Sequence, residues 1–387
     1  RSFFEGADLL NIERAEHFPE ATAHIAEMAD LVRRLRDRGL AYEADGSVYF
    51  RLAAFPAYGR LSGTAERSLR AGAGGRVSAD EYDKEDVRDF VLWKGWVPED
   101  GDVFWETPLG KGRPGWHLEC SAMGMKYLGE SFDIHAGGVD LVFPHHENEI
   151  AQSEGATGKP LARFWLHNAH VSADGRKMSK SLGNVLLLRS FLERGMDPLA
   201  VRLALVAVQY RQPANVTEEG FAAAASSLRR LREFVARLRR AAGAATGAAE
   251  AALGTARAAF EAAVCDDLNL SAALAAVFDL LRACNRLDDA SALGRADAGQ
   301  VLSCLAGFDR ILGLQLLEEP AADAAGGMDE AVAERIRERL AARAARDFAR
   351  ADAIRADLAA RGVVLEDTAE GVRWRGPSGA RGLVPSA

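Results

Sequence analysis

The stretch that constrains the fold most strongly spans residues 132–149 and reads FDIHAGGVDLVFPHHENE. Short apolar runs in it stand next to glycines and histidines, and this pattern continues to Val171. Such runs are typical of strands buried in a parallel sheet, which place functional side chains beyond their ends. The stretch therefore predicts an α/β fold with a site at the edge of its sheet.

Three residue types in this region have the chemistry of metal ligands. Pro144 favours a helix that begins at or near it, so His145 and Glu149, four residues apart, project from one face. Cys120 ends the motif GWHLEC. Sulfur, nitrogen and oxygen donors together suit zinc, and a set of three protein ligands leaves room for a substrate. The pattern indicates a zinc site.

The residues alone leave two questions about this site open. A second interpretation has similar weight: Cys120 is a small buried apolar side chain, and the histidines and glutamates cap a helix or pair with arginines. The histidine ligand is also undecided, because His145 and His146 are adjacent and point about 100° apart around a helix.

A second candidate site lies in residues 174–184, which read DGRKMSKSLGN. Asp174 and Gly175 favour a turn, after which Lys177 and Lys180 stand among small hydroxyl residues and glycine. Ammonium groups on flexible stems can contact phosphate oxygens and neutralise a triphosphate as pyrophosphate forms. Taken in isolation, a solvated basic turn is the safer interpretation.

Composition narrows the class of protein. The 387 residues are 48% hydrophobic, which is enough for two or three domains with sizeable cores. No apolar run reaches the roughly 18 residues of a membrane span, and the start does not resemble a signal peptide, so we expect a cytoplasmic protein without membrane association. The four cysteines lack paired spacing, which suits reduced thiols. The chain has 56 Asp and Glu residues against 48 Lys and Arg residues, which argues against a generally basic surface. RNA binding through the arginines of the second half remains compatible with this balance.

Apolar periodicity predicts the order of elements in the first part of the chain. We expect an amphipathic helix at 24–40 and the strands and loops of an inserted subdomain at 42–92. After Gly183 the pattern becomes helical. Asp197 followed by Pro198 predicts a helix start, because Asp accepts free amide hydrogens and proline has none to lose.

The second part is predicted to be a helical bundle followed by a small module. Apolar stripes at 221–238 and 274–284 predict two bundle helices. The Ala- and Gly-rich stretch 241–252 predicts a mobile loop or frayed helix end, and 318–327 predicts a linker. Two further helical stripes and a hairpin at 363–374 then form a compact C-terminal module.

The lysine loop and the metal motif together resemble one protein family. KMSKS at residues 177–181 is similar to the signature loop of class I aminoacyl-tRNA synthetases, and the motifs before it resemble those of the cysteinyl members. The resemblance covers nearly the whole chain, with its motifs in the right order. Its other segments are residues 89–94, 115–123, 132–153, 266–269 and 347–375.

This resemblance implies three regions. Residues 1–185 form a Rossmann-type α/β catalytic domain with an inserted subdomain at 41–100, residues 186–317 an α-helical bundle, and residues 328–378 a small α+β anticodon-binding module. We expect the catalytic domain to lack its N-terminal segment, because the chain opens at Arg1 without the character of a protein start.

The resemblance also assigns ligands. The family's zinc ligands fall on Cys120, His145 and Glu149, which selects His145 over His146. Its fourth ligand, a cysteine, and a His-Ile-Gly-His-type motif that holds ATP belong to the missing segment. Lys177 and Lys180 are the expected catalytic residues. ATP, with Mg²⁺, is expected to contact Lys177, Met178, Ser179, Lys180 and Ser181.

The implied activity is that of a cysteine–tRNA ligase, whose partners are ATP, L-cysteine and tRNA(Cys). Zinc would bind the cysteine thiolate, a soft ligand that a serine hydroxyl does not match. Asp140 is expected to bind the substrate ammonium group and Trp116 to wall the pocket. Asp140 alternatively caps a helix, and Trp116 alternatively packs in a core. We expect a monomer.

Two positions depart from the family pattern. Ala136 stands where the family usually has glycine, and Gln209 where it commonly has histidine.

Two other functions fit parts of the sequence. A mycothiol-pathway ligase, which joins cysteine to an amino sugar, shares the zinc site and lysine loop but has no use for the C-terminal module. A non-catalytic RNA-binding relic has no need to keep both clusters.

Overall fold

The chain forms two compact units. One comprises residues 15–170, and the other combines residues 1–14 with 171–387. None of the helices in the described ranges is long and apolar enough to cross a membrane. The computed structural model describes residues 2–64, 88–178, 184–318, 322–345, 347–368, 371–376 and 381–385.

A five-stranded antiparallel sheet, in the order β1-β2-β3-β5-β4, forms one part of the first unit. The turn Asp45–Gly46 joins β1 to β2, and its positive φ values, 47° and 71°, are those that a two-residue hairpin requires. Strands β1 and β2 and the start of β3 lie where strands and loops were predicted. The bounds are Ala41–Ala44 (β1), Ser47–Phe50 (β2), Phe90–Gly95 (β3), Trp105–Thr107 (β4) and Gly110–Pro114 (β5).

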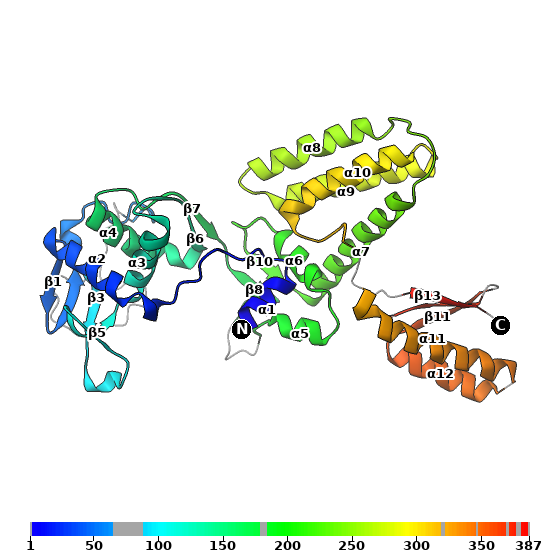
Figure 1. Cartoon of the computed structure of the whole chain (residues 1–387), viewed down its shortest axis with the longest axis horizontal. Helices are drawn as coiled ribbons and strands as arrows, with labels where there is room; N and C mark the ends of the chain where they lie inside the picture. Colours follow the sequence, from blue (N-terminus) through cyan, green and yellow to red (C-terminus); the bar gives the residue numbers. More distant parts are fainter. Residues whose placement is uncertain are drawn as a thin grey trace. The chain divides into compact units, whose positions relative to one another are not determined.

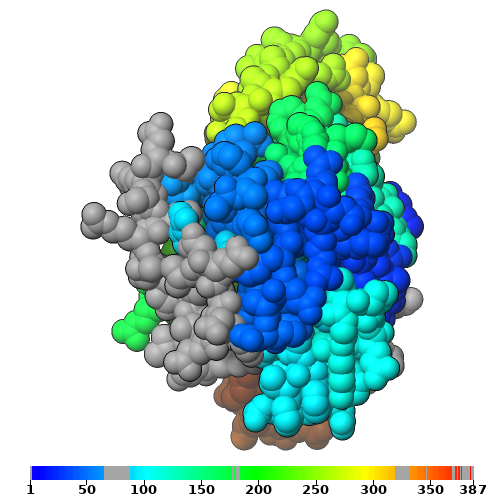
Figure 2. Space-filling view, turned by 90° about the vertical axis from the view of Figure 1, so that its left-hand side faces the viewer, coloured from blue at the N-terminus to red at the C-terminus, as the bar shows by residue number. Residues whose placement is uncertain are grey.

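Three helices, α2 (Ile25–Asp37), α3 (Trp116–Leu128) and α4 (Glu147–Thr157), share an apolar core with this sheet (Figure 1). Helix α2 confirms the amphipathic helix predicted at 24–40. Its buried residues are Met28, Leu31, Val32 and Leu35. Figure 2 shows one outer surface of the unit, where the blue segment that includes α2 meets the cyan hairpin of β4 and β5.

A parallel strand pair confirms the α/β character predicted for the stretch that holds the metal motif. Strands β6 (Phe132–Gly138) and β7 (Ala162–Asn168) pair in parallel, with Gly137 opposite His167. Helix α4 makes the crossover between them, as a parallel connection requires. The carboxyl ends of both strands therefore lie at one edge.

The second unit begins with a small sheet that leads into the lysine loop. Asp174 and Gly175 join β8 to β9 with positive φ values of 49° and 71°, which confirms the predicted turn. Asp197 Oδ1 accepts the Leu199 N–H at 2.9 Å, which confirms the helix start at Pro198. The elements are α1 (Ser2–Leu9), β8 (Val171–Ala173), β9 (Arg176–Lys177), α5 (Leu188–Glu193), α6 (Pro198–Val206) and β10 (Ala214–Val216).

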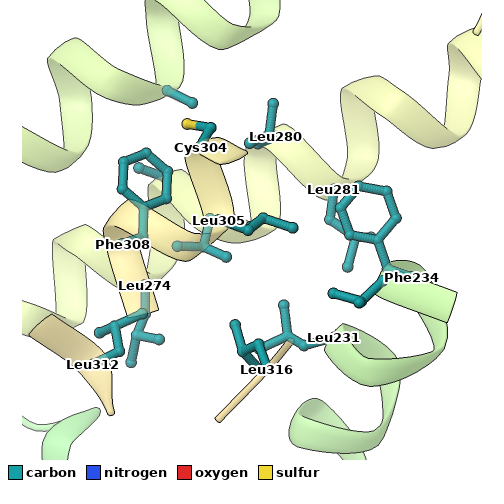
Figure 3. Close-up of a cluster of buried hydrophobic side chains, with 14 of the residues drawn as sticks. Leu231, Phe234, Leu274, Leu280, Leu281, Cys304, Leu305, Phe308, Leu312 and Leu316 are labelled. Atoms are coloured by element: carbon teal, nitrogen blue, oxygen red, sulfur yellow. The ribbon is translucent and has the colours of Figure 1, made fainter. Parts of the chain in front are cut away.

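Helices α7 to α10 form a bundle around the largest apolar core. Figure 3 shows how α7, α9 and α10 contribute Phe234, Leu281 and Phe308 to it. The stretch predicted as a mobile loop at 241–252 is a loop up to the start of α8. It is tied to α10 by Asp297, whose carboxylate accepts two of its backbone N–H groups at 2.9 Å. The helices are α7 (Glu218–Arg240), α8 (Glu250–Cys265), α9 (Leu270–Asp289) and α10 (Arg295–Leu312).

The C-terminal module consists of two helices packed on a three-stranded antiparallel sheet (Figure 1). The predicted helices and hairpin are confirmed, and a third strand, β13, completes the sheet. Trp374 is 6% exposed in the core of the module. The bounds are Ala322–Ala344 (α11), Phe348–Ala360 (α12), Val364–Thr368 (β11), Gly371–Arg375 (β12) and Arg381–Pro385 (β13).

The linker predicted at 318–327 is wrong for most of its length. Helix α11 begins at Ala322 and includes both glycines of that stretch. Alanine is the best helix former, and the helix tolerates two glycines at about 1 kcal/mol each. The alanines around the two glycines therefore outweigh the glycines in this stretch.

Candidate metal centre

The structure brings together the three side chains predicted to bind a metal. Cys120 lies in the second turn of α3, and Glu149 in the first turn of α4. His145 belongs to an irregular turn, Val142–His146, that leads directly into α4. One ligand atom from each of the three residues lies within 4.8 Å of the others.

Glu149 is the most buried charged member of the cluster, at 2% exposure. Its Oε2 accepts a hydrogen bond from His135 Nε2 at 2.6 Å, and its Oε1 lies 2.7 Å from His145 Nε2. Burial favours the neutral acid, but the contacts with the two histidines outweigh it and lower the pKa of Glu149 to about 2. The carboxylate is therefore ionised and available as a ligand.

The Oε1 atom of Glu149 makes the cluster a better fit to a metal than to a hydrogen-bonded network. Although it is close to His145, the geometry is not that of a hydrogen bond, and no described residue donates one to this buried oxygen. Buried polar atoms are rarely left without a partner. A cation bound between Glu149, His145 and Cys120 would supply the missing interaction.

The surroundings of Cys120 favour its neutral thiol. Burial, and then the nearby Glu149 and Glu119 carboxylates, raise the pKa of Cys120 to about 12. A divalent cation binds the thiolate, so its binding must displace this proton. Sulfur, imidazole and carboxylate donors together suit zinc, whose coordination imposes no electronic preference for one ligand type.

The two adjacent histidines belong to different groups. His145 shares the cluster with Cys120, whereas His146 lies in a second group with His135 and Glu149. His146 Nδ1 is 2.8 Å from His167 Nε2. Burial is the main cause that lowers the pKa of His146 to about 4. The side chain that reaches Cys120 is thus the one selected by the family resemblance.

Three more histidines surround the cluster, and sequence reasoning missed them. His117 Nδ1 lies 2.6 Å from His145 Nδ1, and burial, followed by His145, lowers the pKa of His117 to about 4. His135 and His167 come from β6 and β7. His117 stands three residues before Cys120 in the same motif, a signal that could have found it. The other two require the parallel pairing of the strands.

Trp116 and Asp140 are the two residues predicted to bind the amino acid. The Trp116 ring is 59% exposed and stacks on the His145 ring at 4.3 Å, which excludes the alternative that it packs in a core. Asp140 lies in a short turn, Val139–Leu141, and does not cap α4. A Cβ at Gly138 would lie 2.5 Å from Asp140 Oδ1, so glycine leaves space for the carboxylate.

The lysine loop is described only in part. Lys177 ends strand β9, opposite Ser172 on β8. Met178 packs on a small apolar cluster that contains Phe191. The predictions for the Lys177 side chain and for Ser179, Lys180 and Ser181 fall outside the described residues.

Comparison with solved structures supports the fold. The methionyl-tRNA synthetase of Mycobacterium tuberculosis, in complex with methionyl-adenylate, superposes with a TM-score of 0.54 at 17% identity, over 81% of this chain and 75% of that one. A putative arginyl-tRNA synthetase from Campylobacter jejuni gives a TM-score of 0.50 at 12% identity, over 80% and 65%. At these identities the likeness shows the fold alone.

Family comparison divides the chain into three matched segments. Residues 1–226 match the class I (C) tRNA synthetase catalytic domain, residues 259–317 the DALR domain, and residues 325–375 the cysteinyl-tRNA ligase anticodon-binding domain. These matches and the α/β fold around the metal cluster define a class I aminoacyl-tRNA synthetase. The predicted fold class is confirmed, while the exact boundaries at 185, 317 and 328 stay predictions.

Curated relatives narrow the class to one family. The cysteine–tRNA ligase of Solibacter usitatus is 46% identical over 376 residues, which cover 97% of this chain and 79% of the relative. That of Chlamydia pneumoniae is 45% identical over 375 residues, or 96% and 78%. The chain belongs to the cysteine–tRNA ligase family, as its motifs predicted.

Proposed function

We propose that the protein activates L-cysteine with ATP and transfers it to tRNA(Cys). The observation that carries this proposal is the cluster of Cys120, His145 and Glu149 in a chain of the cysteine–tRNA ligase family. Cysteine differs from serine by one atom, so a polar pocket discriminates poorly between them. A set of metal ligands can discriminate through the chemistry of that atom.

Zinc is the proposed resident metal, held by Cys120, His145 and Glu149. When bound, it supplies a Lewis-acid position that prefers the soft cysteine thiolate to a hydroxyl. His117, at 2.6 Å, fixes the ring of His145 from its other nitrogen. Partners of this kind orient metal-bound histidines and tune their affinity.

Trp116 and Asp140 are proposed to complete the amino-acid pocket. The exposed ring of Trp116 lies against His145 and can exclude water from one side of the bound side chain. Asp140 is an exposed carboxylate that can accept hydrogen bonds from the substrate ammonium group. Together they would orient the cysteine carboxylate without taking part in bond formation.

The lysine loop is proposed to act on ATP. The cysteine carboxylate attacks the α-phosphorus, the bond to the β-phosphate oxygen breaks, and pyrophosphate leaves with Mg²⁺. Lys177 and Lys180 are assigned to neutralise charge on that leaving group, and Met178, Ser179 and Ser181 to contact ATP. The terminal ribose hydroxyl of tRNA then attacks the carbonyl carbon, and AMP leaves.

The C-terminal module is proposed to bind the anticodon region of tRNA. Arg350 and Arg355 are exposed on α12, and Arg343 is exposed beside Asp367. These guanidinium groups can contact RNA phosphates. Trp374 is not proposed to contact RNA, because its ring is buried in the module core.

The match of residues 325–375 to an anticodon-binding domain favours a synthetase over the mycothiol-type ligase. Presence of the metal cluster disfavours a non-catalytic relic. We further propose that the enzyme acts as a monomer in the cytoplasm.

Two assays on the zinc-loaded full-length enzyme test the proposal. Cysteine-dependent exchange of pyrophosphate into ATP reports activation, and charging of tRNA(Cys) reports transfer. We expect both, with serine supporting neither at comparable rates. Exchange without charging, together with ligation of cysteine to an amino sugar, would favour the mycothiol-type activity. Absence of exchange would exclude a ligase.

A further inference from the structure

A buried glutamate next to the metal ligands binds a loop rather than the cluster. Glu147 is fully buried in the first turn of α4. Its Oε2 accepts the Gly59 N–H at 2.9 Å, and its Oε1 accepts the Ser62 N–H at 2.6 Å. Both amides belong to a loop that lies 85 or more residues earlier in the chain. The helix that carries Glu149 is thus attached to this loop.

The following residue makes a second attachment to the same loop. Asn148 is 3% exposed, and its Oδ1 accepts the Tyr58 hydroxyl at 2.6 Å. The Tyr58 ring also meets the ring of Phe143 edge to face, with centroids 6.3 Å apart. Phe143 lies in the irregular turn that carries His145. One loop therefore contacts both the start of α4 and the turn before it.

The turn that carries His145 needs such external contacts. Phe143 has extended backbone angles, φ −139° and ψ 132°, in the middle of this turn. A regular helix fixes its geometry by its own hydrogen bonds, but a turn interrupted in this way does not. Its position depends on the groups that pack around it.

Stability alone does not require a carboxylate at position 147. A buried charge is unfavourable unless its lone pairs are satisfied, and in the described ranges the partners of Glu147 are backbone amides rather than a cation. Apolar residues of similar volume often serve stability as well or better at such places. Two hydrogen bonds from loop amides to one carboxylate do, however, fix the position of the loop relative to the turn.

We infer that Glu147 is a positioning residue for cysteine recognition. Through the amides of Gly59 and Ser62 it fixes the turn of His145 relative to Glu149, and so the position in which the cysteine side chain is bound. Asn148 and Tyr58 support the same arrangement. The inference rests on the proposed function and assigns Glu147 no contact with substrate or metal.

The test is Glu147→Gln in the zinc-loaded full-length enzyme. Glutamine keeps the shape but has a single acceptor oxygen, so one loop amide loses its partner. We expect KM for cysteine to rise about tenfold and discrimination against serine to fall, because a lost buried hydrogen bond has effects of this size. Zinc content and KM for ATP should stay within about twofold.

Glu154→Gln is the matched control. Glu154 lies on the same helix and touches the same loop, with Oε1 3.3 Å from Arg60 and 3.2 Å from the Leu161 N–H. It stands seven residues from Glu147, at the far end of α4. The same change of charge should lower Tm there without changing KM for cysteine.

Three outcomes would overturn the inference: a rise in KM that is equal for ATP and cysteine, loss of zinc, or a fall in Tm alone. Tyr58→Phe removes one hydroxyl without changing charge and should raise KM for cysteine about threefold. If Glu147→Gln does not fold, an unchanged KM in Tyr58→Phe still overturns the inference. Absence of exchange in the wild-type enzyme would instead refute the proposed function.

Discussion

Helices α4 and α9 both contribute buried side chains, but the side chains are of different kinds. Helix α9 buries only apolar side chains, which form one face against the bundle: Ala273, Leu274, Ala276, Val277, Leu280, Leu281 and Cys284. Helix α4 buries polar and charged ones as well: Glu147, Asn148, Glu149, Gln152 and Ser153. The burial pattern of α9 is that of an amphipathic helix that packs one apolar face on a core.

The polar residues of α4 are not all satisfied within the protein. In the described ranges, Glu149 Oε1, Gln152 Nε2 and Ser153 Oγ are buried without a hydrogen-bond partner. An uncharged buried group without a partner, as on Gln152 and Ser153, destabilises the fold by about 1–3 kcal/mol. A helix selected for stability alone would resemble α9. Helix α4 therefore carries buried polar groups beside the metal cluster, whereas α9 packs the bundle core.

Loss of the proposed metal ligand Cys120 should have the largest effect on the α4 region. Cys120→Ser removes the soft donor, so we expect most zinc to be lost and cysteine activation to fall at least about 100-fold, since even the partners of metal ligands matter 10- to 100-fold. Metal analysis and cysteine-dependent exchange measure both effects.

Cys265→Ser is the control for this substitution. Cys265 is exposed at the end of α8, and its change should leave zinc content and activity intact. Zinc near one equivalent in the Cys120→Ser protein would remove this residue from the metal site. Cys265→Ser should unfold at the wild-type temperature, whereas Cys120→Ser should unfold at a lower one because a bound metal stabilises the folded state.

Truncation of a core side chain in α9 should affect stability and not metal binding. Leu280 is 1% exposed, and Leu280→Ala should lower the free energy of unfolding of the bundle by about 2–5 kcal/mol. Denaturant-induced unfolding, monitored by hydrogen exchange of the bundle amides, measures this free energy. The control Leu205→Ala, at a position that is 39% exposed, should change the free energy of unfolding by less than about 1 kcal/mol. Loss of zinc in Leu280→Ala would contradict the separation of the two roles.

The same contrast explains how much could be predicted from the sequence. Helix α9 follows from apolar periodicity, which needs no knowledge of the partner. His145 and Glu149 were candidates because residues four apart near the start of a helix project from one side, although His145 lies in the turn just before α4. Cys120 was grouped with them by its ligand chemistry, and the family resemblance selected His145 over His146. The structure adds the distances that bring the three together.

What could not be predicted depends on pairing across long separations. His135 and His167 reach the metal region because β6 and β7 are parallel, and neither carries a local signal. The partners of Glu147 lie on a loop far away in the chain. The burial of Trp374 is a further example, because the composition of a short strand does not tell which of its faces is covered.

Removal of the C-terminal module should separate tRNA charging from cysteine activation. The apolar cluster of the module, from Val332 to Val384, consists of its own residues, so a chain that ends at Glu318 should leave the rest folded. We expect KM for tRNA to rise by roughly tenfold or more and exchange to stay within about twofold, because anticodon contacts are lost while the activation residues remain. Equal losses in both assays would show that the module only supports the fold.

The smallest predicted effect concerns an ion pair in the C-terminal module. Like the start of α4 it contains a carboxylate held by hydrogen bonds, but this carboxylate is partly exposed. Arg339, 4% exposed, donates to both Asp367 oxygens, at 2.8 and 3.0 Å. These hydrogen bonds, and then the charges of Arg339 and Arg343, outweigh burial and hold the pKa of Asp367 below its ordinary value. The pair therefore stabilises the module fully above the unfolded pKa of about 3.9 and is lost as the pH falls through the folded value.

Asp367→Asn tests this difference. The Asp367 side chain is 42% exposed, so solvent screening limits the expected loss to about 1 kcal/mol at pH 7. Hydrogen exchange of the β11 and β12 amides between about pH 3 and pH 6 measures the local stability of the module. Wild-type protection should fall with acid, and in the variant this dependence should become shallower. Glu366→Gln, at the exposed neighbouring position, should keep the wild-type profile. A steep acid dependence in Asp367→Asn would mean that another carboxylate stabilises the module, and that an exposed carboxylate paired with a buried arginine contributes less than its geometry indicates.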